Sequence, residues 1–96
     1  MYKAGKSVVG HAMVLIYLKG PAEGVRVGFA VGKRIGGAVV RNRVKRRLRE
    51  AVTPLLPEIT PGCRLVFVAR SPITGVTYRE IENTVRRLVS KAGLVG

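Results

Sequence analysis

The sequence predicts a small α+β domain, and three observations support this fold class. Three short apolar runs are bounded by glycine, proline or charged residues, as β-strands usually are. Two longer stretches carry apolar residues at the spacing of an amphipathic helix. The chain has 96 residues and is 47% hydrophobic, which is enough for one domain, residues 1–96, with one small core. The expected order of elements is β-β-α-β-α.

The first two predicted strands lie in the N-terminal third of the chain. Residues 12–18 form the longest uninterrupted apolar run, and residues 19–21, Lys-Gly-Pro, predict the turn after it. Residues 7–9 are interpreted as a short extension of this strand across the Gly-His dipeptide that follows them. Residues 25–31 alternate between large apolar side chains and small or charged ones, which is typical of a strand. We expect the strands 12–18 and 25–31 to pair as a hairpin.

The first predicted helix covers residues 38–55 and follows a glycine-rich loop. Its apolar side chains fall on one stripe, formed by Val40, Val44, Leu48, Ala51 and Leu55. Pro54 and Pro57 should fray or stop its C-terminal end. The basic loop and helix together are therefore expected to span residues 32–53.

The C-terminal third predicts another buried strand at 64–70 and a second helix at 77–92. Thr77 and Glu80 have the spacing of a capping box, in which two side chains satisfy backbone N–H groups at the start of a helix. Gly93 fits the position just after the helix end. The buried stripe of this helix is expected to contain Tyr78, Ile81, Val85, Leu88 and Ala92.

The charge of the chain indicates a polyanionic partner. Eighteen lysines and arginines and five glutamates give a formal net charge of +13, and such a charge on a small body causes self-repulsion. Eight basic residues and no acidic residue lie between Lys33 and Arg49. A compact basic block is more typical of a phosphate-binding surface than of a membrane anchor, so nucleic acid is the preferred partner.

Composition argues against several other classes of protein. No apolar run approaches the roughly 20 residues of a membrane-spanning helix, and the charged start of the chain shows no secretory signal. One cysteine, Cys63, cannot form an internal disulfide, and together with a single histidine, His11, it does not supply the usual zinc modules. We therefore expect a cytoplasmic protein with no membrane partner and no zinc.

A helical projection separates two faces of the predicted helix 38–55. The side opposite the apolar stripe carries Asn42, Lys45, Arg46 and Arg49, with Arg41 and Arg43 on the flanks. Like charges on one helix face repel one another, and a merely solvated face normally mixes both signs. Arginine also matches a phosphate with two parallel hydrogen bonds. We interpret this face, together with the backbone N–H groups of the glycine loop, as a phosphate-binding surface.

Residues 31–51 resemble the bacterial ribonuclease P protein subunit. The resemblance is carried by Val-Gly-Lys-Arg-Ile-Gly at 31–36 and by Arg-Asn-Arg-Val-Lys-Arg at 41–46, and the flanking strands and the final helix follow in the same order. It implies a small α/β sandwich similar to ribosomal protein S5 domain 2, with a left-handed β-α-β crossover. Physical principles alone favour the right-handed crossover, which is about 98% of cases.

The resemblance also implies a function. The family's protein subunit binds the catalytic RNA of ribonuclease P and the 5′ leader of precursor tRNA, while the RNA and its Mg²⁺ ions hydrolyse the phosphodiester. The chain itself is then expected to hold no catalytic residue, cofactor or metal. The positions that match the family's RNA-binding motif are Lys33, Arg34, Arg41, Asn42, Arg43, Lys45, Arg46 and Arg49. The leader-binding cleft corresponds to Tyr2, Val14 and Ile16.

The chain departs from the family pattern in two places. Family members often have an aromatic residue at the position of Ile16, whereas here the aromatic is Tyr17, which should point to the opposite face of its strand. Residues 1–7 resemble the end of an N-terminal helix that forms one wall of the cleft, with Tyr2 at its second aromatic position. The sequence lacks most of that helix, and two explanations stay open: a start codon assigned too late, or a protein without this wall. In the second case leader binding would be weaker, but binding to the catalytic RNA would be intact.

Three alternatives compete with this interpretation. A stand-alone nuclease would need clustered carboxylates to hold Mg²⁺, but the chain has no Asp, and Glu80 and Glu82 lie on a predicted surface helix. His11 alone cannot supply an acid–base pair. A helix-turn-helix DNA-binding protein is disfavoured because a strand and a loop precede the basic helix. A structural RNA-binding protein, such as a ribosomal component, would have the same charge and fold and stays open.

Overall fold

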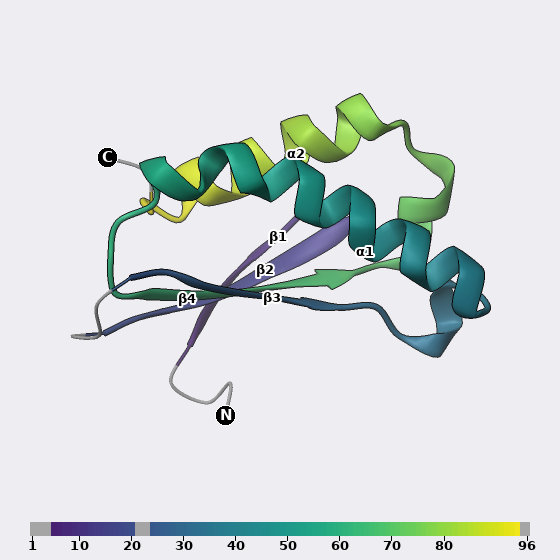
Figure 1. Cartoon of the computed structure of the whole chain (residues 1–96), viewed down its shortest axis with the longest axis horizontal. Helices are drawn as coiled ribbons and strands as arrows, with labels where there is room; N and C mark the ends of the chain where they lie inside the picture. Colours follow the sequence, from purple (N-terminus) through teal and green to yellow (C-terminus); the bar gives the residue numbers. More distant parts are fainter. Residues whose placement is uncertain (1–4, 21–23, 95–96) are drawn as a thin grey trace.

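The computed structural model describes residues 5–20 and 24–94 (Figure 1). Within these residues, four strands form one sheet: β1 (Lys6–Val9), β2 (Met13–Lys19), β3 (Arg26–Ala30) and β4 (Cys63–Ala69). The same residues contain the α-helices α1 (Ala38–Val52) and α2 (Tyr78–Lys91). The connections that the structure describes include the 3₁₀ segments η2 (Lys33–Ile35), η3 (Thr53–Glu58) and η4 (Ser71–Gly75).

The strand order across the sheet is β1-β2-β4-β3. The pairs β1/β2 and β2/β4 are antiparallel, whereas β3 and β4 are parallel. Both helices cover one face of the sheet, and no described helix covers the other (Figure 1). In that view β3 runs in front of β4, α1 returns above the sheet, and β4 then runs behind β3 in the same direction. This crossover is left-handed, as the resemblance implied, and the α+β class is confirmed.

The predicted hairpin between residues 12–18 and 25–31 is wrong. β4 lies between the two strands and pairs with both, so that Phe67 has Leu15 as its register partner on one side and Phe29 on the other. The physical reason is burial. Phe67 is 0% exposed, and a strand this apolar is best covered at the centre of the sheet.

Residues 7–9 form a strand of their own and do not extend the strand at 12–18, so this prediction is also wrong. The chain reverses at Gly10, whose N–H donates to the Met13 carbonyl at 2.8 Å. Gly10 is buried, and a Cβ there would lie 3.0 Å from the Met13 oxygen and 3.3 Å from Thr84 Cγ2. The tight turn makes β1 an edge strand that pairs with β2.

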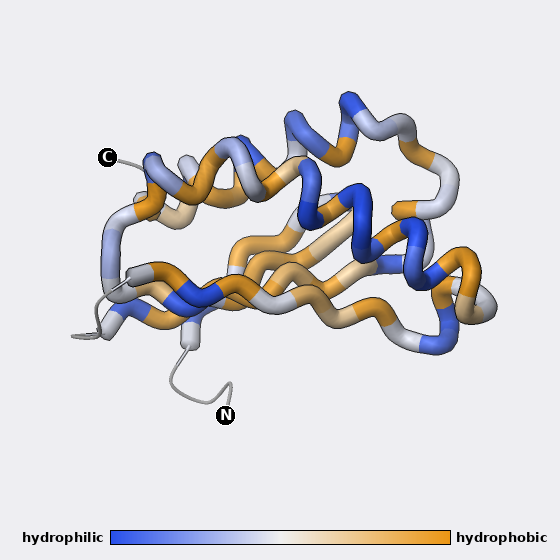
Figure 2. Tube along the Cα trace, viewed as in Figure 1, coloured by the Kyte–Doolittle hydropathy of each residue, from blue (hydrophilic) through white to orange (hydrophobic). Residues whose placement is uncertain are grey.

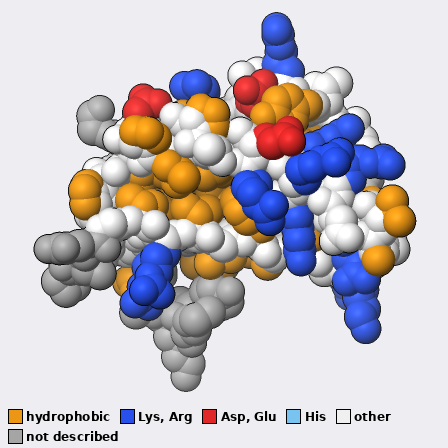
Figure 3. All heavy atoms as spheres, viewed as in Figure 1, with side chains coloured by type: hydrophobic (Ala, Val, Ile, Leu, Met, Phe, Trp, Pro, Cys, Tyr) orange, Lys and Arg blue, Asp and Glu red, His pale blue; other side chains and the backbone are white. Residues whose placement is uncertain are grey.

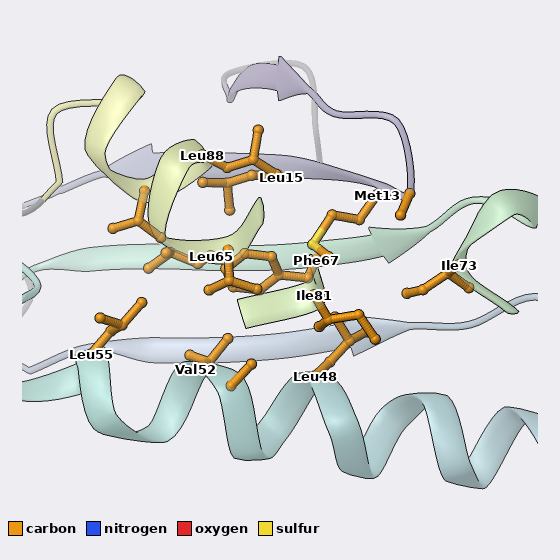
Figure 4. Packing of buried hydrophobic residues seen from close by; sticks show 14 of the residues in the cluster. Met13, Leu15, Leu48, Val52, Leu55, Leu65, Phe67, Ile73, Ile81 and Leu88 are labelled. Atoms are coloured by element: carbon orange, nitrogen blue, oxygen red, sulfur yellow. The ribbon is translucent and has the colours of Figure 1, made fainter. Parts of the chain in front are cut away.

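The core lies between the helix-covered face of the sheet and the two helices. Its fully buried or nearly fully buried side chains include Leu15, Leu65, Phe67, Leu48, Val52, Ile81 and Leu88 (Figure 4). Hydropathy follows the same division, with apolar residues along the strands and hydrophilic residues along much of α1 (Figure 2). The rings of Phe29 and Phe67 stack with their centroids 6.1 Å apart, so the core continues from β4 to the edge strand β3.

α1 ends at Val52, before the predicted end at residue 55. Pro54 lacks the N–H that would continue an α-helix, and the chain changes there to the 3₁₀ segment η3. Leu55 is nevertheless buried, so the predicted apolar stripe continues beyond the helix. The stripe omitted Val52, which is 2% exposed, and included Val40, which is only half-buried.

α2 begins and ends close to its predicted bounds. Thr77 is its N-cap, and the Thr77 hydroxyl oxygen accepts a hydrogen bond from the Glu80 N–H at 3.2 Å. Gly93, just beyond the C-cap Ala92, has a φ of 74°, a conformation that favours glycine after a helix. Of the predicted stripe, Tyr78 alone is half-buried rather than buried.

Replacing Phe67 by alanine should lower the free energy of unfolding by about 3–5 kcal/mol, because a fully buried aromatic side chain leaves a cavity that the core refills only partly. Denaturant unfolding followed by circular dichroism would measure the change. Val66→Ala is the matched control, since Val66 is the neighbouring residue on the uncovered face and is half-buried; its loss should be clearly smaller. Equal losses for the two variants would contradict this placement of the core.

Candidate nucleic-acid interface

The solvent-facing side of α1 presents hydrogen-bond donors. Asn42, Arg43 and Arg46 are exposed and line, with Val39, a shallow hollow of about 450 Å³. Arg46 follows Asn42 by four residues and Arg43 by three, so all three share one helix face. Figure 3 shows lysine and arginine side chains gathered over α1 and the adjoining end of the molecule. The helical projection therefore placed Asn42 and Arg46 on the correct face, whereas it put Arg43 on a flank.

The remaining predicted residues of α1 surround this face. Arg49 is exposed and lines a second hollow, of about 280 Å³, between the C-terminal half of α1 and β3. Lys45 and Arg41 are half-buried. The Arg41 Nε atom is buried and has no hydrogen-bond partner within the described structure, and an unsatisfied buried donor costs about 1–3 kcal/mol. Within the described residues, no hydrogen bond offsets the desolvation of this N–H.

One acidic side chain lies on this surface, because Glu50 is exposed and follows Arg46 by four residues on the same helix face. Glu50, the only acidic residue of α1, is close to Tyr78 of α2. The pKa of Tyr78 is raised above its usual value of 10.0, first by burial of the phenol and then by repulsion from Glu82 and Glu50, so Tyr78 keeps its proton at neutral pH. The other described glutamates lie in η3 and α2. None of the described glutamates lies in the sheet or in the glycine loop.

The glycine loop between β3 and α1 holds two more predicted cations. Lys33 and Arg34 are exposed there, beside the start of α1. Gly36 has a φ of 155°, and a Cβ at this position would lie 2.9 Å from Val40, so the loop requires glycine. Gly37 is the N-cap of α1 and makes no side-chain capping bond. The backbone N–H groups of the first helical turn therefore have no side-chain partner at this cap.

Arg70 and Ser71 extend the cationic surface beyond the predicted residues. They line a hollow of about 400 Å³ together with Lys33 and Arg34. Arg70 Nη1 also donates to the Gly10 carbonyl at 3.0 Å and so ties the end of β4 to the β1–β2 turn. The sequence analysis missed both residues because they are far from the loop in the chain. The one signal for Arg70 was the alternation of side chains along the predicted strand at 64–70, which places residue 70 on the same face as residues 64, 66 and 68.

The uncovered face of the sheet brings together two residues predicted for the leader cleft. Val14 and Ile16 are half-buried on this face, and their register partners on β4 are Val68 and Val66. Tyr17 points to the helix-covered face, as predicted, and packs against the core. The centre of the uncovered face, where β2 and β4 pair, is therefore aliphatic. Tyr2, the third predicted cleft residue, lies outside the described residues.

Other chemistry-bearing groups do not join these surfaces. Within the described residues, no group of three or more His, Cys, Asp or Glu side chains is arranged to hold a metal ion. No helix in that part of the chain is long and apolar enough to cross a membrane. Cys63 is buried at 2% exposure, and His11 is exposed in the β1–β2 turn.

Fold and surface together define a class of protein. It is a small, strongly basic α+β domain with a cationic helix face, a cationic glycine loop and an uncovered aliphatic sheet face, all suited to a polyanion. A sequence model described as Ribonuclease P matches residues 1–93. The chain therefore belongs to the ribonuclease P protein family.

Two relatives have the same name, "Ribonuclease P protein component". The relative from Symbiobacterium thermophilum is 44% identical over 96 residues, a match that covers 99% of this chain and 84% of the relative. The relative from Roseiflexus castenholzii is 52% identical over 71 residues, a match that covers 73% of this chain and 58% of that relative. The match thus spans little more than half the length of the Roseiflexus protein.

Solved structures of the family have the same fold. The ribonuclease P protein of Staphylococcus aureus superposes with a TM-score of 0.89 at 28% identity, covering 99% of this chain and 87% of that one. The protein from Thermotoga maritima superposes with a TM-score of 0.80 at 24% identity, covering 90% of this chain and 82% of that one. At that identity the Thermotoga structure supports the fold alone.

Replacing Gly36 by alanine should destabilise the fold by about 1–3 kcal/mol, because the new Cβ would meet Val40 in a backbone conformation that only glycine adopts easily. Gly37→Ala is the control, since Gly37 has a φ of −71° and open space around it; we expect a cost of about 0.5 kcal/mol. Thermal unfolding would measure both, and equal melting temperatures would contradict the assigned loop geometry.

Proposed function

We propose that this chain is the protein subunit of a ribonuclease P ribonucleoprotein in the cytoplasm. In this role it binds the catalytic RNA and the 5′ leader of precursor tRNA, and it assists the RNA-catalysed removal of the leader. Membership of the family supports this proposal. The observation that carries it is the cationic face of α1 beside the cationic glycine loop.

The catalytic RNA is proposed to bind α1 and the glycine loop. The binding residues are the seven cations and one amide predicted from the sequence: Lys33, Arg34, Arg41, Asn42, Arg43, Lys45, Arg46 and Arg49. Each cation that meets a phosphate releases counterions, so this contact should be strong at low salt. Arginine binds phosphate through two parallel hydrogen bonds, and Asn42 has both a donor and an acceptor for a base edge or a 2′-OH.

The 5′ leader is proposed to cross the uncovered face of the sheet. Val14 and Ile16, with their partners on β4, form an aliphatic floor for sugars and bases. The hollow lined by Lys33, Arg34 and Arg70 supplies cations at the end of this floor. Stacking on an aromatic side chain adds about 1–3 kcal/mol per base, so an aliphatic floor should hold the leader more weakly than an aromatic one.

The hydrolysis is assigned to the RNA and its Mg²⁺ ions. Magnesium is bound in proteins through carboxylates and substrate phosphates, and in a ribonucleoprotein the RNA phosphates can supply these ligands. The chain contributes cations instead. These cations reduce the electrostatic repulsion between the catalytic RNA and the precursor tRNA. Without the protein, a high concentration of free cations would be needed to screen this repulsion.

Reconstitution tests the proposed function directly. Adding the chain to a bacterial ribonuclease P RNA and a precursor tRNA at low Mg²⁺ should increase the rate of 5′-leader release, because protein cations replace part of the ionic screening. Gel-resolved time courses would measure the rate, with RNA alone and protein alone as controls. Cleavage by the protein alone would indicate a stand-alone nuclease. RNA binding without stimulation would contradict the proposal and favour a structural RNA-binding role.

The double substitution Arg43→Ala/Arg46→Ala should weaken binding to the catalytic RNA about 10- to 100-fold, because it removes two charge-assisted contacts. The slope of log affinity against log salt should fall by about 1.4–1.8, the value for two phosphates. Filter binding over a salt series would measure both quantities. The control Arg79→Ala/Arg87→Ala removes the same charge from exposed positions of α2. Equal losses for the two double variants would show that net charge, and not the α1 face, determines affinity.

A further inference from the structure

The uncovered face of the sheet carries a pair of arginines that the proposed function does not use. Arg26 on β3 and Arg64 on β4 are register partners in the parallel pair, and both are exposed. Neighbouring strands lie about 4.8 Å apart, and like charges at directly paired positions destabilise a sheet. No described glutamate lies in the sheet to offset this repulsion.

The alternation of side chains places the pair on the uncovered face. Leu65 is buried against the helices, so its neighbours Arg64 and Val66 face the other way. Gly28, the register partner of Val66, has no side chain. On β3, therefore, no side chain projects from the uncovered face at the position next to Arg26. The arginine pair therefore stands at one end of the aliphatic floor.

The other end of this floor is also cationic. Arg70 follows β4 directly and shares a hollow with Lys33 and Arg34 of the glycine loop. From residue 64 to residue 70 an extended strand covers about 20 Å, which is long enough for several nucleotides of a single strand. The floor thus has a group of positive charges at each end and aliphatic side chains between them.

We propose that Arg26 and Arg64 together bind a backbone phosphate of the 5′ leader, at the end of the sheet remote from the glycine loop. The inference rests on the proposed function, in which the catalytic RNA lies against the glycine loop and α1. The cleavage site then lies toward that end, and the leader runs across the floor to the arginine pair. Two adjacent guanidinium groups can each donate two hydrogen bonds to one phosphodiester, and its charge removes their mutual repulsion.

This site should measure the length of the leader and not its sequence. A phosphate contact positions a nucleic acid but carries no base information. A leader that ends near the glycine loop cannot reach the pair, whereas a leader that crosses the floor can. Affinity should therefore increase once the leader is long enough to span the sheet.

The test is the double variant Arg26→Gln/Arg64→Gln, assembled with a bacterial ribonuclease P RNA and given two precursor tRNAs. One has a leader of one nucleotide, and the other has a leader long enough to cross the sheet. We expect binding of the long-leader substrate to weaken about 10-fold, with binding of the short-leader substrate and of the catalytic RNA unchanged. Arg79→Gln/Arg87→Gln, on exposed positions of α2, is the charge-matched control and should behave like the native chain. Equal weakening of both substrates, or no weakening, would overturn the proposal.

A second measurement separates this site from the proposed function. The free protein is titrated with a single-stranded RNA oligonucleotide over a salt series, with fluorescence anisotropy as the readout. The Arg26→Gln/Arg64→Gln variant should lower the salt slope by about 0.7 relative to the α2 control, as expected when one phosphate contact with a single strand is lost. An unchanged slope would overturn the site. A lowered slope in a chain that fails to stimulate leader release would support the site and reject the proposed function.

Discussion

The parallel pairing of β3 with β4 is the constraint on which the rest of the structure depends. Because the two strands lie side by side and run in the same direction, the chain must cross back over the sheet between them, and α1 is that connection. Its left-handed sense determines which face of the sheet α1 covers, and on that face α1 lies over β3 while α2 lies over β1 and β2 (Figure 1). The basic face of α1 therefore meets solvent, while its apolar stripe closes the core.

The same constraint positions the other two surfaces. The glycine loop is the start of the crossover, so Lys33 and Arg34 lie next to the first turn of α1. Both helices pack against one face of the sheet, so no described element covers the opposite face. β3 borders both regions, since its neighbours are α1 on the covered face and the aliphatic floor on the other. A nucleic acid on the floor and one on α1 would thus meet near the glycine loop.

Unfavourable local features, such as an unsatisfied donor, an unusual backbone conformation or adjacent like charges, occur on these surfaces and not in the core that the structure describes. Arg41 has an unsatisfied buried donor, Gly36 has a backbone conformation that excludes a side chain, and Arg26 stands beside Arg64. By contrast, the buried residues are apolar, and Thr77 caps α2 in the usual way. Departures of this kind concentrate where a protein binds a partner. Their positions agree with the proposal that the loop, the helix face and the sheet face bind RNA.

The sequence by itself determined the elements and their faces. The spacing of Val44 and Leu48 set the buried side of α1, and alternation set the opposite directions of Ile16 and Tyr17, because such periodicities depend only on neighbouring residues. The tertiary structure alone decided which strands pair, so that β4 separates β2 from β3 and the expected hairpin does not form. It also brought Arg70 to the glycine loop and Arg64 beside Arg26. Pairing between strands far apart in the chain depends on how the whole sheet buries its most apolar strand, and no local pattern contains that information.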